Sequence, residues 1–275
     1  MEALCWIRNR CLRAKKHLGQ NFLQNTFLSK RIVVSVGLSP EETILEIGCG
    51  TGSLTQHLIV TQSYIGVEVD QRLCARLQQQ YEGPGIKFLN RDILTVDLTQ
   101  LRRRHPSSSF KIVGNLPYSI SSPILQHLTH HVDVIDLVVV MLQSEVADRI
   151  IAEPGSRKYG VLTLIVQYYF RPQLLFSIPP HAFKPQPKVH SKVVRLSPQP
   201  NRVLQLHDES RFFRFIKTAF SQKRKTLKNC LKGIPRYQHD RLRFLLHKLH
   251  YPPDVRAEEV SLAHFVELFL SVSNS

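Results

Sequence analysis

Short apolar runs that predict buried strands recur along the chain up to about residue 200. They lie at residues 43–47, 64–70, 86–89, 110–114, 136–142, 174–178 and 192–196. Between them the apolar residues recur at helical spacing, as Leu54, Leu58 and Ile59 do after the first run. Strands that alternate with helices predict an α/β fold, a doubly wound parallel sheet with helices on both faces. We expect one late strand to be antiparallel.

Two helix starts can be placed from their capping residues. One helix should begin with a cap at Asn25 or Thr26 and carry Phe27 on its inner face. Another should have Ser122 as its N-cap and Pro123 as its first residue, since proline suits the first helical position. Both helices would flank the predicted sheet.

The strand pattern stops after a proline-containing linker at residues 198–207. Beyond the linker, apolar residues at helical spacing predict three helices, around residues 212–220, 242–249 and 262–269. We therefore predict three regions, which are a basic N-terminal arm (1–25), a Rossmann-like α/β domain (26–200) and a small all-α C-terminal domain (201–275).

Positive charge gathers near the two ends of the chain. The formal net charge is +16, from 37 Lys and Arg against 21 Asp and Glu. Residues 8–31 hold seven cations and no acid, and residues 208–250 hold twelve cations against three acids. This distribution predicts a polyanionic partner. Nucleic acid fits better than a membrane, because Gly233 and Pro235 interrupt the basic segment. The candidate RNA-binding residues are Lys15, Lys16, Lys223, Arg224, Lys225 and Lys228.

The cysteines and the apolar runs exclude several classes of protein. The five cysteines, at positions 5, 11, 49, 74 and 230, are scattered and form no Cys-x-x-Cys pair. Neither a disulfide framework nor a metal site is indicated. The longest apolar run, 137–142, is far too short to span a membrane, and the N-terminal apolar part is too short for a secretory signal. We expect a cytoplasmic protein without a membrane or metal partner.

A glycine-rich turn follows the first predicted strand and suggests a cofactor. Residues 48–52 read Gly-Cys-Gly-Thr-Gly, with Glu46 before them and Glu68 at the end of the next strand. Glycine allows a tight turn and close approach of a ligand. The spacing differs from the G-x-G-x-x-G of nicotinamide sites and favours S-adenosylmethionine, whose ribose hydroxyls bind an acid. Asp92 and Ile93, after the third strand, are candidates for binding the cofactor's adenine.

The tetrapeptide Asn115-Leu116-Pro117-Tyr118 follows the predicted strand 110–114. α/β proteins bind ligands where the strands of the sheet end. The Asn115 side chain and the Leu116 carbonyl can accept the two N–H bonds of a planar amine. Pro117 fixes the turn and offers no donor, and Tyr118 offers a face on which a base can stack.

A proline-rich loop between the last two predicted strands holds an aromatic residue. Residues 179–191 contain too many prolines for a strand, and Phe183 has no regular apolar face to join. Phe183 could clamp the second face of a base. The alternative is that it packs within the core of its own loop.

Together these motifs resemble the ribosomal RNA adenine dimethyltransferases, specifically the branch associated with kasugamycin sensitivity. The resemblance runs from about residue 12 to residue 270. The motifs are 19–23 (Gly-Gln-Asn-Phe-Leu), 46–52 (Glu-Ile-Gly-Cys-Gly-Thr-Gly), 115–118 with 121–125 (Ser-Ser-Pro-Ile-Leu), 183–191 (Phe-Lys-Pro-Gln-Pro-Lys-Val-His-Ser) and 219–227 (Ala-Phe-Ser-Gln-Lys-Arg-Lys-Thr-Leu). It implies S-adenosylmethionine-dependent N6,N6-dimethylation of two adjacent adenosines in the 3′-terminal hairpin of 16S rRNA. The implied context is biogenesis of the small ribosomal subunit by a monomer.

The same resemblance implies roles for individual residues. Asn21 and Leu23 would help to close the cofactor site, and Gly48 would lie under the cofactor's methionine moiety. Gly50 and Asn115 are further candidates for binding the cofactor. Glu68 would bind its ribose, and Asp92 with Ile93 its adenine. Asn115 and Leu116 would receive the target amine, with Pro117 fixing the turn of this catalytic motif, and Tyr118 and Phe183 would stack on the ring of the target base. The chain departs from the family at Cys49, where proline is common, and at Ser119, where asparagine is common.

Three other functions are alternatives for this sequence. A large-subunit rRNA adenine methyltransferase is disfavoured by the basic motif at 219–227. A non-catalytic RNA-binding assembly factor is disfavoured by the intact motif at 115–118. A nicotinamide oxidoreductase is disfavoured by the glycine spacing at 48–52.

Overall fold

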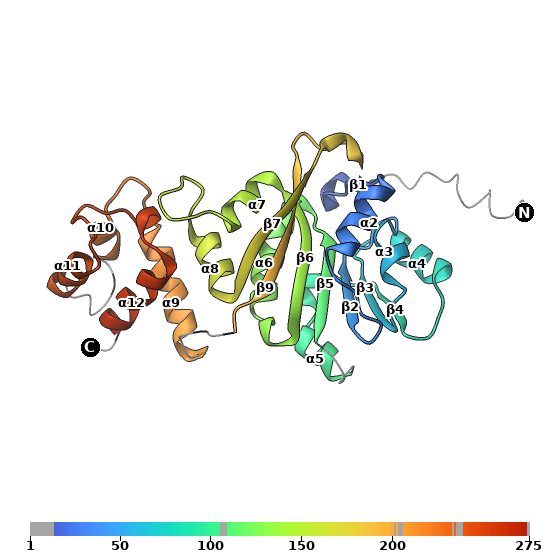
Figure 1. The fold of residues 1–275 in the computed structure, drawn as a ribbon, viewed down its shortest axis with the longest axis horizontal. Coiled ribbons are helices and arrows are strands. Elements are labelled where there is room, and N and C mark those ends of the chain that lie inside the picture. The colour runs from blue at the N-terminus through green and yellow to red at the C-terminus, as the bar shows by residue number, and fades with distance from the viewer. Residues whose placement is uncertain are drawn as a thin grey trace, which may run out of the picture.

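A seven-stranded sheet forms the centre of the molecule (Figure 1). The computed structural model describes residues 14–104, 109–200, 202, 206–232, 234 and 239–273. The strands are β2 (Thr43–Ile47), β3 (Ser63–Val67), β4 (Ile86–Leu89), β5 (Phe110–Asn115), β6 (Ile135–Gln143), β7 (Phe170–Ile178) and β9 (Ser191–Pro198). Their order is β4-β3-β2-β5-β6-β9-β7. In the described part of the chain, β9 alone runs antiparallel to the other six strands of this sheet, which confirms the predicted α/β fold with one late antiparallel strand.

The strand order reverses between β2 and β5. From β2 the chain builds outward through β3 to β4, and it then returns to place β5 on the other side of β2. Such a reversal opens a crevice at the carboxyl ends of the strands. The register places Ile47 beside Gly114, so the glycine turn after β2 and the tetrapeptide after β5 meet at this crevice.

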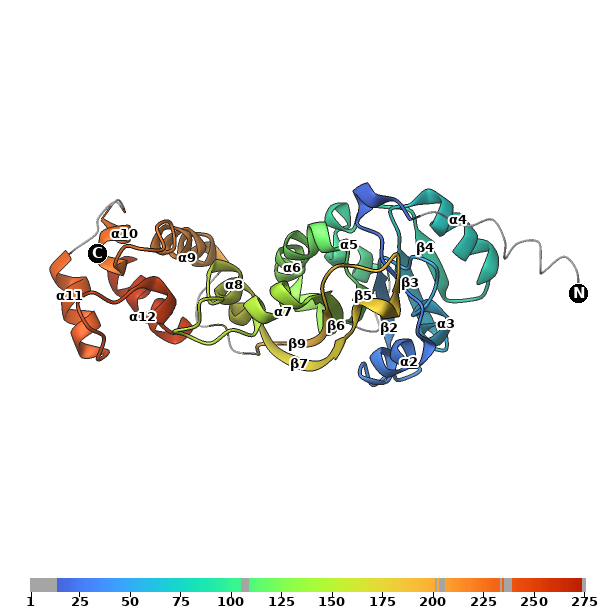
Figure 2. The same ribbon diagram turned by 90° about the horizontal axis from the view of Figure 1, so that it is seen from above.

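Each face of the sheet has its own core. One core joins helices α2 (Thr26–Val34), α3 (Thr55–Leu58) and α4 (Gln71–Gln80), and the other joins α5 (Leu98–Arg103), α6 (Ser121–Thr129), α7 (Ser144–Ile150) and α8 (Val161–Tyr169). Alternate residues of β2 serve the two cores, since Ile44 belongs to the first, and Leu45 and Ile47 to the second. Figure 2 shows α2 and α3 on one side of the sheet and α5 and α6 on the other.

Two predicted helix details were wrong. Asn25 does cap α2, because its side chain accepts from the Leu28 N–H at 3.0 Å, but Phe27 is 73 % exposed. Helix α6 begins at Ser121, one residue before the predicted cap at Ser122. A preceding 3₁₀ turn, η3 (Tyr118–Ile120), leads directly into α6, and the Ser121 hydroxyl donates to the Pro117 carbonyl at 2.9 Å.

Four helices follow the sheet and gather at one end of the molecule, beyond α8 (Figure 1). They are α9 (Leu206–Ala219), α10 (Leu227–Leu231), α11 (His239–Lys248) and α12 (Leu262–Ser273). Three were predicted, and α10 was missed because five residues show no clear period. The hydroxyls of Tyr168 and Tyr169 on α8 donate to buried Glu209 on α9 at 3.1 and 2.6 Å. The helical region is therefore fastened to the sheet by a shared core.

Several predictions fall on residues outside the described ranges. These are the first part of the basic arm, Cys5, Cys11, Gly233 and Pro235. The domain boundaries at 25 and 200 also stay predictions. In the described part of the chain, no helix is both long and apolar enough to cross a membrane.

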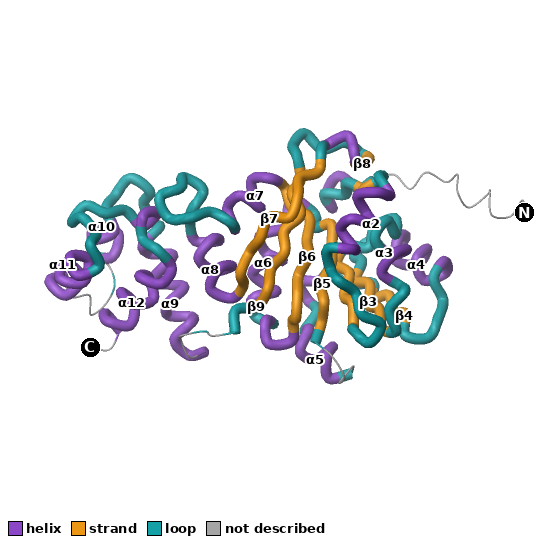
Figure 3. The backbone as a smooth tube through the Cα atoms, in the orientation of Figure 1, coloured by secondary structure: helices purple, strands orange, loops and turns teal. Residues whose placement is uncertain are grey.

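The proline-rich loop does contain a strand, contrary to the sequence prediction. β1 (Phe22–Leu23) and β8 (Phe183–Lys184) form a two-stranded antiparallel sheet. Figure 3 shows β8 beside the N-terminal segment, apart from the central sheet. The strand was missed because its partner lies about 160 residues earlier, so no local pattern marks it. It ties the loop to the segment before α2.

Candidate active site

A cavity lies at the point where the strand order reverses. It opens to solvent, and its empty space is about 670 Å³ when the open mouth is counted. Its walls are the segment 18–22, the glycine turn, the ends of β3 and β4, and the tetrapeptide after β5. The cavity thus joins five stretches that are distant in sequence.

Most of the predicted site residues line this cavity. They are Asn21, Gly48, Gly50, Glu68, Asp92, Ile93, Asn115, Leu116, Pro117 and Tyr118. Leu23 and Phe183 do not, since they are 2 % and 4 % exposed and belong to the core under α2. The two residues face each other across the β1–β8 pair. Phe183 is therefore buried with residues outside its own loop, such as Ile32 on α2.

The glycine turn needs glycine for its backbone conformation. Gly48 and Gly50 have φ angles of +73° and +56°, in the left-handed region that side chains disfavour. A Cβ at Gly50 would also lie 3.2 Å from the Phe22 ring. The Gly50 N–H donates to Glu68 Oε2 at 2.8 Å. The turn therefore leaves space for the cavity and is hydrogen-bonded to Glu68, the acid after β3.

Glu68 lies in the cavity wall and is only 5 % exposed. Its Oε1 accepts from the Asp70 N–H at 2.9 Å, in addition to the bond from Gly50. Burial raises the pKa of Glu68, while these two backbone N–H groups lower it. A carboxylate held by backbone donors is positioned to accept hydrogen bonds from a diol.

Glu46 does not line the cavity, although the sequence pattern placed it with the cofactor motif. It is 1 % exposed, and its Oε2 accepts from the Thr55 and Tyr64 hydroxyls at 2.8 and 2.5 Å. Burial raises the pKa of Glu46 to about 7. The Cys49 thiol lies 3.6 Å from the Tyr64 hydroxyl. This buried cluster supports the glycine turn from behind.

The Asn115 side chain is oriented by the N-terminal segment. Its Nδ2 donates to the Asn21 carbonyl at 2.8 Å, which leaves the amide oxygen as an acceptor. The Leu116 N–H donates to the Met141 carbonyl at 3.1 Å, so the turn is also tied to β6. The Asn115 amide oxygen is thus poised to accept from an amine in the cavity.

Tyr118 is held through its hydroxyl, which lies 2.7 Å from Ser191 Oγ at the start of β9. Ser191 is fully buried. Burial raises the pKa of the Tyr118 hydroxyl, so the ring is neutral at physiological pH. Ser191 was quoted only as the last residue of a motif, and its contact with Tyr118 could not be read from the sequence.

Other cavity residues were missed by sequence reasoning. They are Leu18, Gly19, Gln20, Phe22, Ile47, Val67, Val69, Arg91, Ile120 and Ile124. Val69 and Arg91 each lie two residues beyond the end of a parallel strand, a position that could have marked them. Gly19, Gln20 and Phe22 belong to the motif at 19–23, but the sequence analysis assigned a role only to Asn21 and Leu23 of that motif.

The candidate RNA-binding residues lie in two places. Lys223, Arg224 and Lys225 are exposed between α9 and α10, with Lys228 half-buried on α10, at the end of the molecule far from α2 (Figure 1). Lys16 is exposed near the cavity. Lys15 instead places its ammonium 3.2 Å from Asp70 Oδ1. Within the described residues, no group of three or more His, Cys, Asp and Glu side chains could hold a metal ion.

Comparison with known proteins gives consistent matches over nearly the whole chain. Residues 11–273 match the family described as ribosomal RNA adenine dimethylase. A protein of Xanthomonas euvesicatoria named ribosomal RNA small subunit methyltransferase A is 40 % identical over 257 residues, which cover 93 % of this chain and 95 % of that protein. A protein of the same name from Gloeobacter violaceus is 38 % identical, with coverages of 92 % and 91 %.

Two solved structures are similar over their full length. A dimethyladenosine transferase from Plasmodium falciparum superposes with a TM-score of 0.77 at 25 % identity, covering 92 % of this chain and 98 % of the other. The 23S rRNA methyltransferase ErmE superposes with a TM-score of 0.74, also at 25 % identity, covering 92 % of this chain and all of the other.

Proposed function

Because the chain belongs to the ribosomal RNA adenine dimethylase family, we propose that it methylates adenosine N6 in ribosomal RNA with S-adenosylmethionine as the methyl donor. Its similar relatives are named small subunit methyltransferases. We therefore assign to it the N6,N6-dimethylation of two adjacent adenosines in the 3′-terminal hairpin of 16S rRNA. The observation that carries this proposal is one cavity that joins the glycine turn, Glu68 and Asn115.

The cavity residues fit S-adenosylmethionine. Glu68, held by two backbone N–H groups, would accept the two ribose hydroxyls. Gly48 leaves space for the methionine moiety, since a Cβ there would contact only the Asn115 carbonyl, at 3.6 Å. Asp92 and Ile93, in the wall beyond β4, would receive the adenine. When bound, the cofactor supplies an electrophilic methyl group on a positively charged sulfur.

The residues after β5 would position the acceptor. The lone pair of adenine N6 is delocalised into the ring and is a poor nucleophile. The Asn115 amide oxygen and the Leu116 carbonyl would accept its two N–H bonds and draw the nitrogen toward tetrahedral geometry. Pro117 brings no competing donor. This is catalysis by positioning and electrostatics, and no strong base is needed because the methylated nitrogen is acidic and loses its proton afterwards.

The target base must leave its stack to enter the cavity, which costs a few kcal/mol. We propose that the Tyr118 ring, anchored at Ser191, recovers part of this cost by stacking. A second clamp by Phe183 requires its ring to leave the core under α2, because only 4 % of the residue is exposed. Contact with rRNA outside the cavity would come from Lys16 and from Lys223, Arg224, Lys225 and Lys228, whereas Lys15 already has an internal partner.

The direct test is methyl transfer from labelled S-adenosylmethionine to small ribosomal subunits that lack these methyl groups. Nuclease digestion then identifies the modified nucleoside. Dimethyladenosine in the 3′-terminal hairpin is the expected product. Label in another RNA, or no transfer by a protein that binds the cofactor, would overturn the assigned substrate.

A large-subunit substrate is the second candidate, because ErmE, a 23S rRNA methyltransferase, superposes almost as well as the dimethyladenosine transferase. The same assay with unmethylated 23S rRNA separates the two. We expect transfer to the small subunit alone. A monomeric state and a cytoplasmic location remain predictions.

A further inference from the structure

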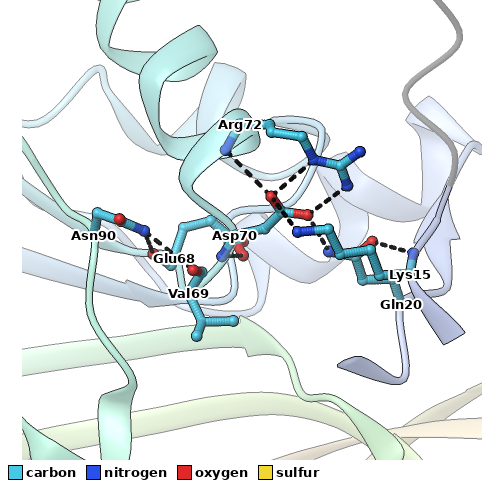
Figure 4. A network of polar contacts seen from close by, with 7 residues as sticks. All are labelled: Lys15, Gln20, Glu68, Val69, Asp70, Arg72 and Asn90. Carbon is cyan, nitrogen blue, oxygen red and sulfur yellow. Dashed lines mark hydrogen bonds and ion pairs between the residues drawn. The ribbon is translucent and has the colours of Figure 1, made fainter. Parts of the chain in front are cut away.

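Asp70 connects the cofactor half of the cavity to the segment that walls it. Its side chain is fully buried, yet it carries a carboxylate that accepts from three residues (Figure 4). Lys15 Nζ and Gln20 Nε2 each donate at 3.2 Å. Arg72 donates from its backbone N–H and twice from its guanidinium, at 3.2, 3.1 and 2.8 Å. These hydrogen bonds lower the pKa of Asp70 well below its usual range, and the bonds from the Arg72 side chain contribute most to this shift.

The contacts of Asp70 also reach the proposed ribose-binding acid. The Asp70 N–H donates to Glu68 Oε1 at 2.9 Å. Asn90, at the end of β4, donates to the carbonyls of Glu68 and Val69 at 2.8 and 3.1 Å. Figure 4 shows these residues around one short loop between β3 and α4. The loop is therefore rigid, and Asp70 is fixed relative to Glu68.

We call residues 18–22 the N-terminal wall. All five residues line the cavity. The wall is fastened at two places, at Gln20 by Asp70 and at Asn21 by the Asn115 side chain. Gln20 is itself oriented by the Lys15 N–H, which donates to Gln20 Oε1 at 2.7 Å. The wall thus spans from the cofactor half of the cavity to the acceptor half.

Helix capping alone does not account for this arrangement. Asp97 caps α5 by accepting from the Gln100 N–H at 3.0 Å, and 45 % of its side chain is exposed. Asp70 caps α4 in the same way, but it is buried and faces two cations. One of those cations, Lys15, lies 55 residues away in the chain, before the wall. Burying a charge is costly unless it is paired and hydrogen-bonded. Lys15 and Gln20 supply part of this pairing for the Asp70 carboxylate, and they belong to the N-terminal segment and not to α4.

We propose that Asp70 is a positioning residue that holds the N-terminal wall closed over the cofactor. By fixing the wall, it also keeps the Asn21 carbonyl in place to accept from the Asn115 side chain. The inference rests on the proposed function. It predicts that Asp70 slows escape of the cofactor without touching it, because Asp70 and Lys15 do not line the cavity. Loosening the wall also frees the Asn115 amide, which couples cofactor retention to acceptor positioning.

The test compares Asp70→Asn and Lys15→Met with Arg72→Gln as the matched control. Asparagine caps a helix as well as aspartate does, so Asp70→Asn removes the charge and keeps the cap. Arg72→Gln removes the carboxylate's other cation, on the α4 side, and leaves both wall contacts. Two quantities are measured on the full chain, which are the dissociation rate of S-adenosylmethionine and backbone hydrogen exchange of residues 15–22 with and without it.

We expect cofactor dissociation about tenfold faster in Asp70→Asn and about fivefold faster in Lys15→Met, the range expected for losing hydrogen bonds to a charged group. Exchange in residues 15–22 should accelerate in both variants, and Arg72→Gln should match the wild type within about twofold. Wild-type rates in Lys15→Met, or an equal effect of Arg72→Gln, would overturn the inference even if Asp70→Asn failed to fold. A wild-type protein that did not bind S-adenosylmethionine would instead overturn the proposed function.

Discussion

Asn115 shows how one side chain depends on a contact outside its own motif. The tetrapeptide supplies the amide, but the Asn21 carbonyl determines which way the amide points. Without that bond, either end of the amide could face the target amine. The N-terminal segment therefore takes part in acceptor positioning, although it is distant in sequence.

Asn115→Ala should lower methyl transfer roughly 10²–10³-fold, the range for loss of one preorganised hydrogen-bonding group at a reacting centre. The cofactor should still bind, since Glu68 and the glycine turn are unchanged. Single-turnover transfer to small subunits measures the first effect, and calorimetry with S-adenosylmethionine the second. A parallel loss of cofactor binding would contradict the separation of these roles.

Glu46 should make stability depend on pH. Burial raises its pKa to about 7 from 4.5, so below pH 4.5 the carboxyl is protonated in both the folded and the unfolded chain. As the pH rises toward 7 the unfolded chain loses this proton first, and the free energy of unfolding falls. The fall is up to about 3 kcal/mol and is complete above pH 7.

Glu46→Gln removes this titration and keeps an acceptor for the Tyr64 hydroxyl. Relative to the wild type, the variant should gain stability between pH 4.5 and 7.5. Urea unfolding at both pH values measures the difference. Unfolding free energies that change in parallel in the two proteins would show that Glu46 is ionised in the folded chain.

At the scale of elements, local sequence patterns predicted the strands of the central sheet. They did not predict strands whose pairing partner is distant in sequence. β4 was predicted with its observed limits and β2 likewise, because each is a short, mostly apolar segment followed by a polar residue or a glycine. The β1–β8 pair escaped prediction, since each strand has only two residues and neither has an alternating pattern. Residues 19–23 were quoted as a motif, but their pairing with the loop at 183–184 could not be predicted from it.

The contact between β9 and the turn η3 predicts a coupled pair of variants. Ser191→Ala and Tyr118→Phe each remove the bond that anchors the tyrosine ring. Each should lower methyl transfer about fivefold to tenfold, from a net hydrogen bond of about 1 kcal/mol. The double variant should be no worse than either single one, because the same bond is lost.

Single-turnover rates on the two single variants and the double variant complete this cycle, with the melting temperature as the control for folding. If the fold-loss of the double variant equals the product of the two single fold-losses, the two hydroxyls act independently. In that case β9 would not position Tyr118.

At the scale of the whole molecule, one group of exposed cations lies far from the cavity. The exposed cations between α9 and α10 are at the opposite end from the N-terminal segment (Figure 1). The core that runs from α8 into α9 and α12 holds this end in place. Such a separation suits a large substrate that is gripped at one place and modified at another.

Replacing Lys223, Arg224 and Lys225 with alanine should weaken binding of rRNA and lower the slope of log affinity against log salt by roughly 2–3. Cofactor affinity should not change. The control replaces Arg102, Arg103 and Arg104, which are exposed at the end of α5. Binding is measured at several salt concentrations. An equal effect of both triple variants would assign it to net charge and not to the α9–α10 loop.

The sequence by itself determined the sheet, most of the helices and the residues at the strand ends. Apolar period, capping residues and glycine spacing are local properties, and the carboxyl ends of parallel strands meet at one edge. The contacts that orient the side chains of those residues were determined only by the tertiary structure. Asn21 orients Asn115, Ser191 anchors Tyr118, Asp70 fastens Gln20, and Leu23 and Phe183 are buried together. These are contacts between segments far apart in sequence, and no local periodicity encodes them.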